Sequence, residues 1–224
     1  MNVVAKANAN AMKAAIARKN SERQVSERET EEILRLAEAS LKVSGDFVEL
    51  GCYKGDTSLL LQRLLESKKQ RSDKMSSAEP SSEKKLWIYD SFEGLPAKTT
   101  EDSSSAGEAF QEKELFVTKR EVVERFKRAG LRVPIIKKGF FEKLSPEVDL
   151  PGEISFAFLD GDLYQSIKTS LKLVFPKLAD DGLVLVHDYN NPQLPGSAKA
   201  VDEFLKIHPE FKLQVYETLA ILKR

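Results

Sequence analysis

The sequence predicts an α/β domain built on an open, doubly wound and mostly parallel sheet. Short, largely apolar segments alternate along the chain with amphipathic segments of helical periodicity, and acidic residues recur where the apolar segments end. Strands that helices bury on both faces have this apolar character, and parallel strands are normally connected by helices. With 224 residues, the chain is long enough for one such domain with a sizeable core.

The predicted elements begin with a helix and a strand. Over 26–43, apolar residues recur every three or four positions, and a capping-box sequence that starts at Ser26 marks the beginning of the helix. An apolar strand is predicted over 47–50, and a glycine turn over 51–55 then leads into a second helix that includes 58–65. This order is the strand-turn-helix start of a doubly wound sheet.

A polar stretch interrupts the alternation. Residues 67–85 are rich in serine and charge and contain almost no apolar side chains, so we expect a disordered polar insertion there rather than a domain boundary. We therefore divide the chain into an N-terminal helical extension, 1–45, and one α/β domain, 46–224. The remaining predicted strands cover 86–89, 133–136, 154–159 and 183–186, and one or two closing strands at an antiparallel edge cover 212–222. The remaining predicted helices cover Val122 to Phe126, 166–178 and 198–207.

Composition restricts the classes of partner. Lysine plus arginine and aspartate plus glutamate both number 35, so the formal net charge is zero and no overall field attracts nucleic acid or an anionic membrane. Cys52 is the single cysteine, which excludes a disulfide within the chain, and the sequence shows neither a secretory signal nor an apolar run of about 20 residues. We therefore expect a cytoplasmic protein that acts on a small molecule or on another protein.

Acidic residues stand at or just after the ends of four predicted strands. They are Glu49, Asp90, Asp160 and Asp188. In an open α/β sheet the ligand lies in a crevice outside the carboxyl ends of the strands, so we expect these four side chains to converge there. This convergence is the main physical argument for an active site.

The glycine turn indicates the class of cofactor. Glu49-x-Gly51-x-x-x-Gly55 lacks the glycine spacing of a dinucleotide-binding turn and the lysine-serine or lysine-threonine ending of a phosphate-binding loop, which disfavours an NAD-linked oxidoreductase. S-adenosylmethionine carries no phosphate and needs only a tight turn and a helix start for its aminoacyl group. An acid that pairs with ribose hydroxyls is expected roughly 20 residues after such a turn, and Asp90 stands at that distance once the polar insertion is discounted.

Four ordered segments resemble the macrocin and mycinamicin O-methyltransferase family, whose members are class I methyltransferases with a Rossmann-like fold. The segments are VELGCYKGDTS (48–58), YDSFEGLP (89–96), LDGDLYQS (159–166) and HDY (187–189). The resemblance spans about 46–204. It implies methyl transfer from S-adenosylmethionine to a hydroxyl, often on a sugar attached to a natural product and commonly with magnesium.

Carried onto this sequence, the resemblance implies a residue set for each part of the site. Asp160 and Asp188 would bind the metal ion. The macrolide enzymes tend to carry paired aspartates after the last strand, whereas this chain has His187 before Asp188, so the expected metal is Mg²⁺ or another divalent cation. Gly51, Gly55, Thr57 and Ser58 would hold the aminoacyl end of the cofactor, Asp90 and Ser91 the ribose, and Gly139 and Phe140 the surroundings of the adenine, with Glu49 and Asp160 completing the cofactor site.

Methyl transfer to oxygen requires activation of the acceptor. An alcohol is a poor nucleophile while protonated, so it must be positioned and must lose its proton to a base or under the influence of a metal. The predicted catalytic and metal-binding group is Asp160, His187 and Asp188, whose two carboxylates suit magnesium. His187 has three interpretations: a general base, a ligand that favours a transition metal, or a histidine hydrogen-bonded at a strand end. Asp162 is interpreted as the N-cap of the following helix, with a neighbour of the metal ligands as the alternative.

These observations predict an O-methyltransferase that acts on a small molecule or saccharide with the assistance of a divalent cation. The alternative is a catalytically inactive binding or scaffold protein, because a fold does not guarantee its chemistry. The sequence does not identify the acceptor. A homodimer formed through the N-terminal helices is compatible with it.

Overall fold

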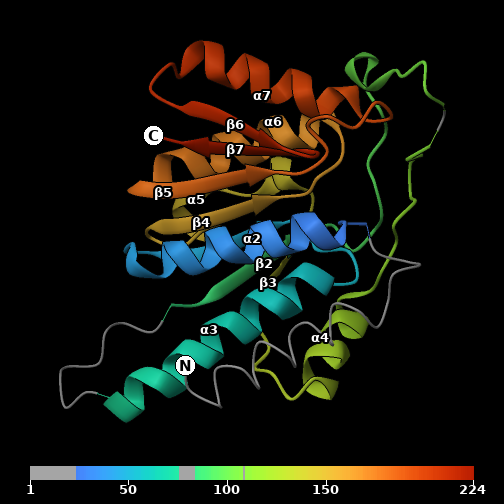
Figure 1. Ribbon diagram of the computed structural model, residues 1–224. Helices are drawn as coiled ribbons and strands as arrows, with labels where there is room; N and C mark the ends of the chain where they lie inside the picture. The colour runs from blue at the N-terminus through green and yellow to red at the C-terminus, as the bar shows by residue number, and fades with distance from the viewer. Residues whose placement is uncertain (1–23, 76–83, 108) are drawn as a thin grey trace.

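The computed structural model describes residues 24–75, 84–107 and 109–224, which form a seven-stranded sheet covered by helices on both faces (Figure 1). The strand order is β3-β2-β1-β4-β5-β7-β6. Strands β1 to β5 are parallel, and β7 is antiparallel to both β5 and β6. This arrangement confirms the predicted fold class. The strands are β1 (Asp46–Leu50), β2 (Leu86–Asp90), β3 (Ile135–Lys138), β4 (Ile154–Leu159), β5 (Leu178–Val186), β6 (Lys212–Tyr216) and β7 (Leu219–Lys223).

The helices alternate with the strands along the chain. The α-helices are α2 (Glu27–Ala39), α3 (Asp56–Met75), α4 (Lys119–Arg128), α5 (Pro146–Asp149), α6 (Tyr164–Val174) and α7 (Pro195–Ile207), and short 3-10 helices cover Ser40–Lys42, Thr100–Asp102, Phe141–Lys143 and Phe175–Lys177. None of the helices in the described part of the chain is both long enough and apolar enough to cross a membrane.

Two apolar layers pack against the sheet. Successive strand residues point to opposite faces, so Phe47 contributes to the layer beneath α2, α3 and α4, whereas Val48 contributes to the layer beneath α6 and α7. Helices α2 and α3 lie side by side on their face (Figure 1). Ile33 and Ala37 of α2 are fully buried in the first layer, so the described part of the predicted N-terminal extension shares the core of the α/β domain. Residues 1–23 lie outside the described residues.

The start of α2 agrees with the predicted capping box. The Ser26 hydroxyl accepts a hydrogen bond from the Glu29 backbone N–H at 3.2 Å, and the Glu29 carboxylate accepts one from the Ser26 backbone N–H at 3.1 Å. These bonds satisfy two backbone donors that a helix start otherwise leaves without partners. The same glutamate has a further role in the candidate site.

The two largest differences between predicted and observed boundaries concern α3 and β5. Helix α3 runs through Met75, so the first part of the predicted disordered insertion, 67–75, is helical, and 76–83 lies outside the described residues. Lysine, glutamine and arginine are good helix formers, and extending an existing helix costs far less than starting a new one. Strand β5 begins at Leu178 rather than at 183, because a shift in its register with β4 accommodates the polar residues at its start.

Candidate active site

The four strand-end acids lie on neighbouring strands. Glu49 is inside β1, Asp90 ends β2, Asp160 directly follows β4, and Asp188 comes two residues after β5. These strands are adjacent in the order β2-β1-β4-β5, and the chain reverses its direction of winding between β1 and β4. The predicted convergence at the carboxyl ends of the strands is therefore confirmed, at the topological switch point where ligands bind in doubly wound sheets.

The glycine turn after β1 requires glycine for two reasons. Gly51 has a φ of +93°, a backbone conformation that residues with a side chain rarely adopt. A Cβ at this position would lie 2.0 Å from the carbonyl oxygen of Asp160, so the turn also passes directly against the end of β4. Gly55 has a φ of +78° and leads into α3. The turn thus brings the backbone that opens α3 next to Asp160.

Asp90 ties the end of β2 to this turn. One oxygen of its carboxylate accepts hydrogen bonds from the backbone N–H groups of Cys52 and Tyr53, both at 3.0 Å. The other oxygen accepts one from the N–H of Phe92 at 2.8 Å. Burial raises the pKa of Asp90, although these three hydrogen bonds oppose the shift. The carboxylate therefore has a structural role, and its second oxygen has a further lone pair for a ligand.

A pocket opens beside the turn, and most of the predicted cofactor residues line it or its neighbour. Tyr53 and Gln24 line both cavities; Gln24 lies just before α2 and was not anticipated from the sequence. The first pocket includes Gly51, Asp90, Ser91, Phe140 and Asp160 in its wall, and the adjoining pocket includes Glu49, Thr57 and Asp160.

Three predicted cofactor residues lie outside the pocket walls. Ser58 is fully buried and donates a hydrogen bond from its hydroxyl to Glu49 at 2.5 Å. Burial raises the pKa of Glu49 well above its ordinary value, and the Ser58 hydrogen bond only partly opposes this. Gly55 and Gly139 shape the backbone: Gly139 has a φ of +150° and donates its N–H to the Asp90 carbonyl at 2.9 Å. Ser58 therefore reaches the pocket only through Glu49.

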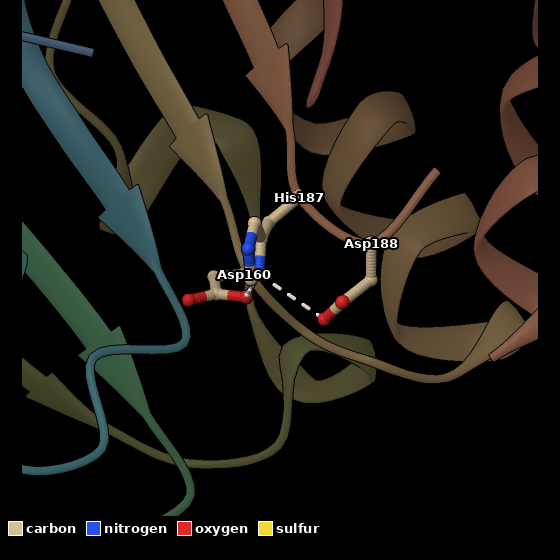
Figure 2. Close-up of side chains that lie close together, drawn as sticks. All are labelled: Asp160, His187 and Asp188. Carbon is tan, nitrogen blue, oxygen red and sulfur yellow. Dashed lines mark hydrogen bonds and ion pairs between the residues drawn. The ribbon is translucent and has the colours of Figure 1, made fainter. Parts of the chain in front are cut away.

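Asp160, His187 and Asp188 form a compact cluster at the ends of β4 and β5 (Figure 2). The Nδ1 atom of His187 lies 2.9 Å from Asp160 Oδ1 and 3.1 Å from Asp188 Oδ2. One nitrogen or oxygen atom from each residue lies within 4.8 Å of the others, a spacing that fits three ligands of one cation. Figure 2 shows the imidazole ring with this nitrogen directed toward the two carboxylates.

The electrostatic surroundings of His187 are strongly negative. Burial by itself would lower the pKa of His187, but the charge of Asp160 and contacts with Asp160, Asp188 and Glu29 outweigh it and raise the pKa well above its ordinary value. A raised pKa strengthens the hold of the ring on its proton, and an imidazole must be unprotonated to act as a general base. Of the three interpretations of His187, the position of Nδ1 beside both carboxylates favours a ligand, because a cation bound there would take the place of the proton and offset the charge of Asp160 and Asp188.

Asp162 does not cap α6 as predicted. Its φ of +60° places its backbone in the left-handed region, and the N-cap of α6 is Leu163. The backbone N–H of Tyr164 instead donates a hydrogen bond to Asp102 Oδ1 at 2.7 Å. Asp102 comes from a loop far earlier in the chain, so no local sequence pattern could reveal it. The Asp162 carboxyl lines the first pocket with no hydrogen-bond donor among the described residues, and burial and the charges of Asp160 and Asp188 raise its pKa well above the ordinary value.

Comparisons with known proteins agree with this geometry. The chain is 29% identical over 153 residues to the 8-demethyl-8-(2,3-dimethoxy-alpha-L-rhamnosyl)-tetracenomycin-C 4'-O-methyltransferase of Streptomyces olivaceus, covering 66% of this chain and 54% of that protein. It is 27% identical over 168 residues to the demethyldecarbamoylnovobiocin O-methyltransferase of Streptomyces niveus, covering 72% and 58%. The chain thus spans little more than half the length of these curated relatives.

Solved structures and a family model extend the comparison. The structure of the O-methyltransferase NovP matches with a TM-score of 0.71 and 25% identity, covering 92% of this chain and 83% of that one. The calicheamicin methyltransferase CalS11 shares the fold with a TM-score of 0.71 at 16% identity, covering 100% and 93%. The family model described as macrocin-O-methyltransferase (TylF) matches residues 28–212, which include the glycine turn and all four strand-end acids. The chain therefore belongs to the macrocin O-methyltransferase family.

Proposed function

We propose that this protein transfers a methyl group from S-adenosylmethionine to a hydroxyl of a glycosylated small molecule, with a divalent cation bound by Asp160, His187 and Asp188. The observation that carries the proposal is the position of this cluster: Asp160 belongs both to the cluster and to the walls of the two pockets beside the glycine turn. A donor in the pocket and an acceptor at the cluster would therefore meet. The relative from Streptomyces olivaceus, whose name specifies a rhamnosyl compound, supports the class of acceptor.

The residues of the pocket fit a positively charged cofactor. Glu49, Asp90 and Asp160 surround it, and burial raises the pKa of Glu49 and of Asp90, which indicates that these carboxyls lack a compensating cation. S-adenosylmethionine supplies an electrophilic methyl group on a positively charged sulfur. Asp90 would accept from a ribose hydroxyl through its spare lone pair, and the wall formed by Phe140 offers an apolar surface for the adenine.

The cluster fits a divalent cation by its donor set. Two carboxylates and an imidazole nitrogen form a mixed oxygen and nitrogen site, which suits Mn²⁺, Fe²⁺ or Zn²⁺ better than the oxygen-only surroundings that Mg²⁺ prefers. The chemistry that such a cation supplies is a fixed positive charge that makes a nearby hydroxyl more acidic. Asp160 and Asp188 would orient the acceptor hydroxyl next to the cofactor pocket.

Asp162 is the best-placed acceptor for the proton of the hydroxyl. It lines the pocket with Asp160, is buried, and has no hydrogen-bond donor among the described residues, so its carboxyl oxygens are available to a ligand. Burial and the charges of Asp160 and Asp188 raise its pKa, which makes its carboxylate more basic than that of an exposed aspartate. His187 is less suited to this role because its Nδ1 atom already faces Asp160 and Asp188, at 2.9 and 3.1 Å.

Cofactor binding is tested by calorimetry on a matched pair of variants. Asp90→Ala removes the acceptor of three backbone N–H groups and is expected to weaken S-adenosylmethionine binding by at least about tenfold. Glu93→Gln, in the same loop but exposed and paired with Lys138 at 3.2 Å, should bind as the wild type does. Melting curves establish that both variants fold. Absence of binding by the wild type would refute the proposal.

Catalysis is tested with hydroxylated glycosides and S-adenosylmethionine. Mass spectrometry detects the methylated product, and release of S-adenosylhomocysteine measures the rate, with and without a chelator. We expect turnover that a chelator suppresses and that added Mn²⁺ restores. Retained cofactor affinity without turnover on any glycoside in the panel would instead support a binding protein, and turnover unaffected by the chelator would remove the cation from the proposal.

A further inference from the structure

A buried glutamate from helix α2 lies behind the candidate cation site. Glu29 is in the first turn of α2 and is only 3% exposed, and His187 is 4% exposed. The Oε2 atom of Glu29 lies 3.7 Å from His187 Nε2, which is within ion-pair range although longer than a direct hydrogen bond. The opposite ring nitrogen, Nδ1, faces Asp160 and Asp188. The histidine is thus held between one carboxylate on its inner side and two on the side of the site.

The position of the Glu29 carboxylate is fixed by the hairpin of β6 and β7. Its Oε1 atom accepts hydrogen bonds from the backbone N–H and the hydroxyl of Thr218, at 2.9 and 2.5 Å. Its Oε2 atom accepts one from the Ser26 backbone N–H at 3.1 Å. Each of these partners is a donor, so the carboxylate acts as an acceptor on all sides. The remaining side of Oε2 faces His187, where it favours a proton on Nε2.

We propose that Glu29 is a positioning residue that holds His187 with Nε2–H toward α2 and with Nδ1 toward Asp160 and Asp188. This inference rests on the cation role proposed above. A histidine that ligates a metal usually donates its other ring N–H to a carboxylate or carbonyl, which fixes both the ring orientation and the tautomer. Glu29 stands where that partner is required. The docking of helix α2 on the hairpin thereby becomes part of the cation site.

The substitution Glu29→Gln reverses the polarity of this contact with little change in shape. The carbonyl oxygen of glutamine takes the place of Oε1, where Thr218 donates twice, so its amide NH₂ replaces Oε2 opposite His187. Glutamine serves at capping-box positions in general, but in this orientation it loses the bond from the Ser26 backbone N–H, because Oε2 is the acceptor of that bond. An amide N–H opposite His187 donates to Nε2 and favours the tautomer with the proton on Nδ1. That tautomer presents a proton, rather than a lone pair, to the cation site.

The matched control is Glu217→Gln. Glu217 accepts a hydrogen bond from the Ser26 hydroxyl at 2.9 Å and pairs with Arg28 at 3.5 Å, so it belongs to the same contact between α2 and the hairpin. It makes no contact with His187. A loss of function caused by loosening of the contact between α2 and the hairpin would therefore occur in both variants. Misplacement of His187 would occur only in Glu29→Gln, where the tautomer of His187 distinguishes it from the loss of the Ser26 N–H bond.

Two measurements on the purified full chain test the inference. Calorimetric titration with Mn²⁺ at constant pH should show affinity about 10- to 100-fold lower in Glu29→Gln than in the wild type and in Glu217→Gln. Long-range ¹H–¹⁵N correlation spectra of the Zn²⁺-loaded protein report the protonated ring nitrogen, and the sequence has only two histidines, His187 and His208, which makes assignment straightforward. We expect Nε2–H for His187 in the wild type.

The outcomes separate this inference from the proposed function. Equal Mn²⁺ affinity and the same tautomer in Glu29→Gln and the wild type would overturn the role of Glu29 and leave the cation site intact. No cation binding by the wild type would overturn both the cation site and this role, while S-adenosylmethionine binding would still support methyl transfer. If Glu29→Gln does not fold, Glu29→Asp replaces it with the same expectation, because its shorter side chain withdraws the carboxylate from Nε2.

Discussion

Alanine at Gly51 should destabilise the protein much more than alanine at Gly130, a second glycine with positive φ. Both substitutions place a side chain in the left-handed region, with φ values of +93° and +66°, at a cost of roughly 1–2 kcal/mol. At Gly130 the new Cβ meets nothing within 4 Å, so this cost is the whole effect. At Gly51 the Cβ would lie 2.0 Å from the Asp160 carbonyl oxygen, and overpacking against backbone adds roughly 1–3 kcal/mol.

The expected loss of unfolding free energy is therefore roughly 2–5 kcal/mol for Gly51→Ala and roughly 1–2 kcal/mol for Gly130→Ala. In a domain of this size 1 kcal/mol corresponds to a shift of roughly 2–4 °C in Tm, so urea unfolding and melting curves both resolve the difference. The clash also pushes the ends of β1 and β4 apart, so S-adenosylmethionine affinity should fall in Gly51→Ala only. Equal destabilisation by the two substitutions would refute the close approach of the turn to Asp160.

Two further predictions concern buried acids. Burial raises the pKa of Glu49, so the folded chain stays protonated at pH values where the unfolded chain is ionised, and wild-type stability falls as pH rises above about 4.5. Glu49→Gln cannot ionise and should therefore gain stability relative to the wild type as the pH rises above about 4.5, measured by urea titrations at several pH values. A difference independent of pH would contradict the buried state of Glu49. Asp102→Ala leaves the buried backbone N–H of Tyr164 without its acceptor and should lower the unfolding free energy by about 1–3 kcal/mol. Asp102→Asn keeps an acceptor oxygen, so it should lose less unfolding free energy in the same urea titration.

The sequence predicts the parts of the site that depend on strand order. Asp90 and Asp160 follow apolar segments that can only be buried strands, and the carboxyl ends of parallel strands meet at one edge of a sheet. The glycine turn is equally local, because its tight backbone requires glycine at Gly51 whatever surrounds it. These residues could be found without any knowledge of tertiary contacts.

Residues that act across the fold leave no such pattern. Glu29 has the sequence signal of a capping box, which the structure confirms, yet its contact with His187 depends on how α2 docks beside β5 and the C-terminal hairpin. Asp102 supplies an acceptor to α6 from a loop far earlier in the chain. Asp162 has the residue type and position of an N-cap, but its backbone is left-handed, the N-cap is Leu163, and Asp162 lines the pocket instead. In each case a tertiary contact decides between alternatives that local sequence permits.

The concentration of carboxylates at this edge of the sheet has a cost that ligands would offset. Burial raises the pKa of Glu49 and of Asp162, and among the described residues no lysine or arginine contributes to offsetting the charge of either carboxylate. Such groups destabilise a folded protein unless they are paired. S-adenosylmethionine, with its positively charged sulfur, would add positive charge where these acids converge, and so would a divalent cation. Any ligand that binds only the folded state stabilises that state. Apolar residues at these positions would give a more stable empty protein and a weaker site, so the proposed ligands explain the acids where folding alone does not.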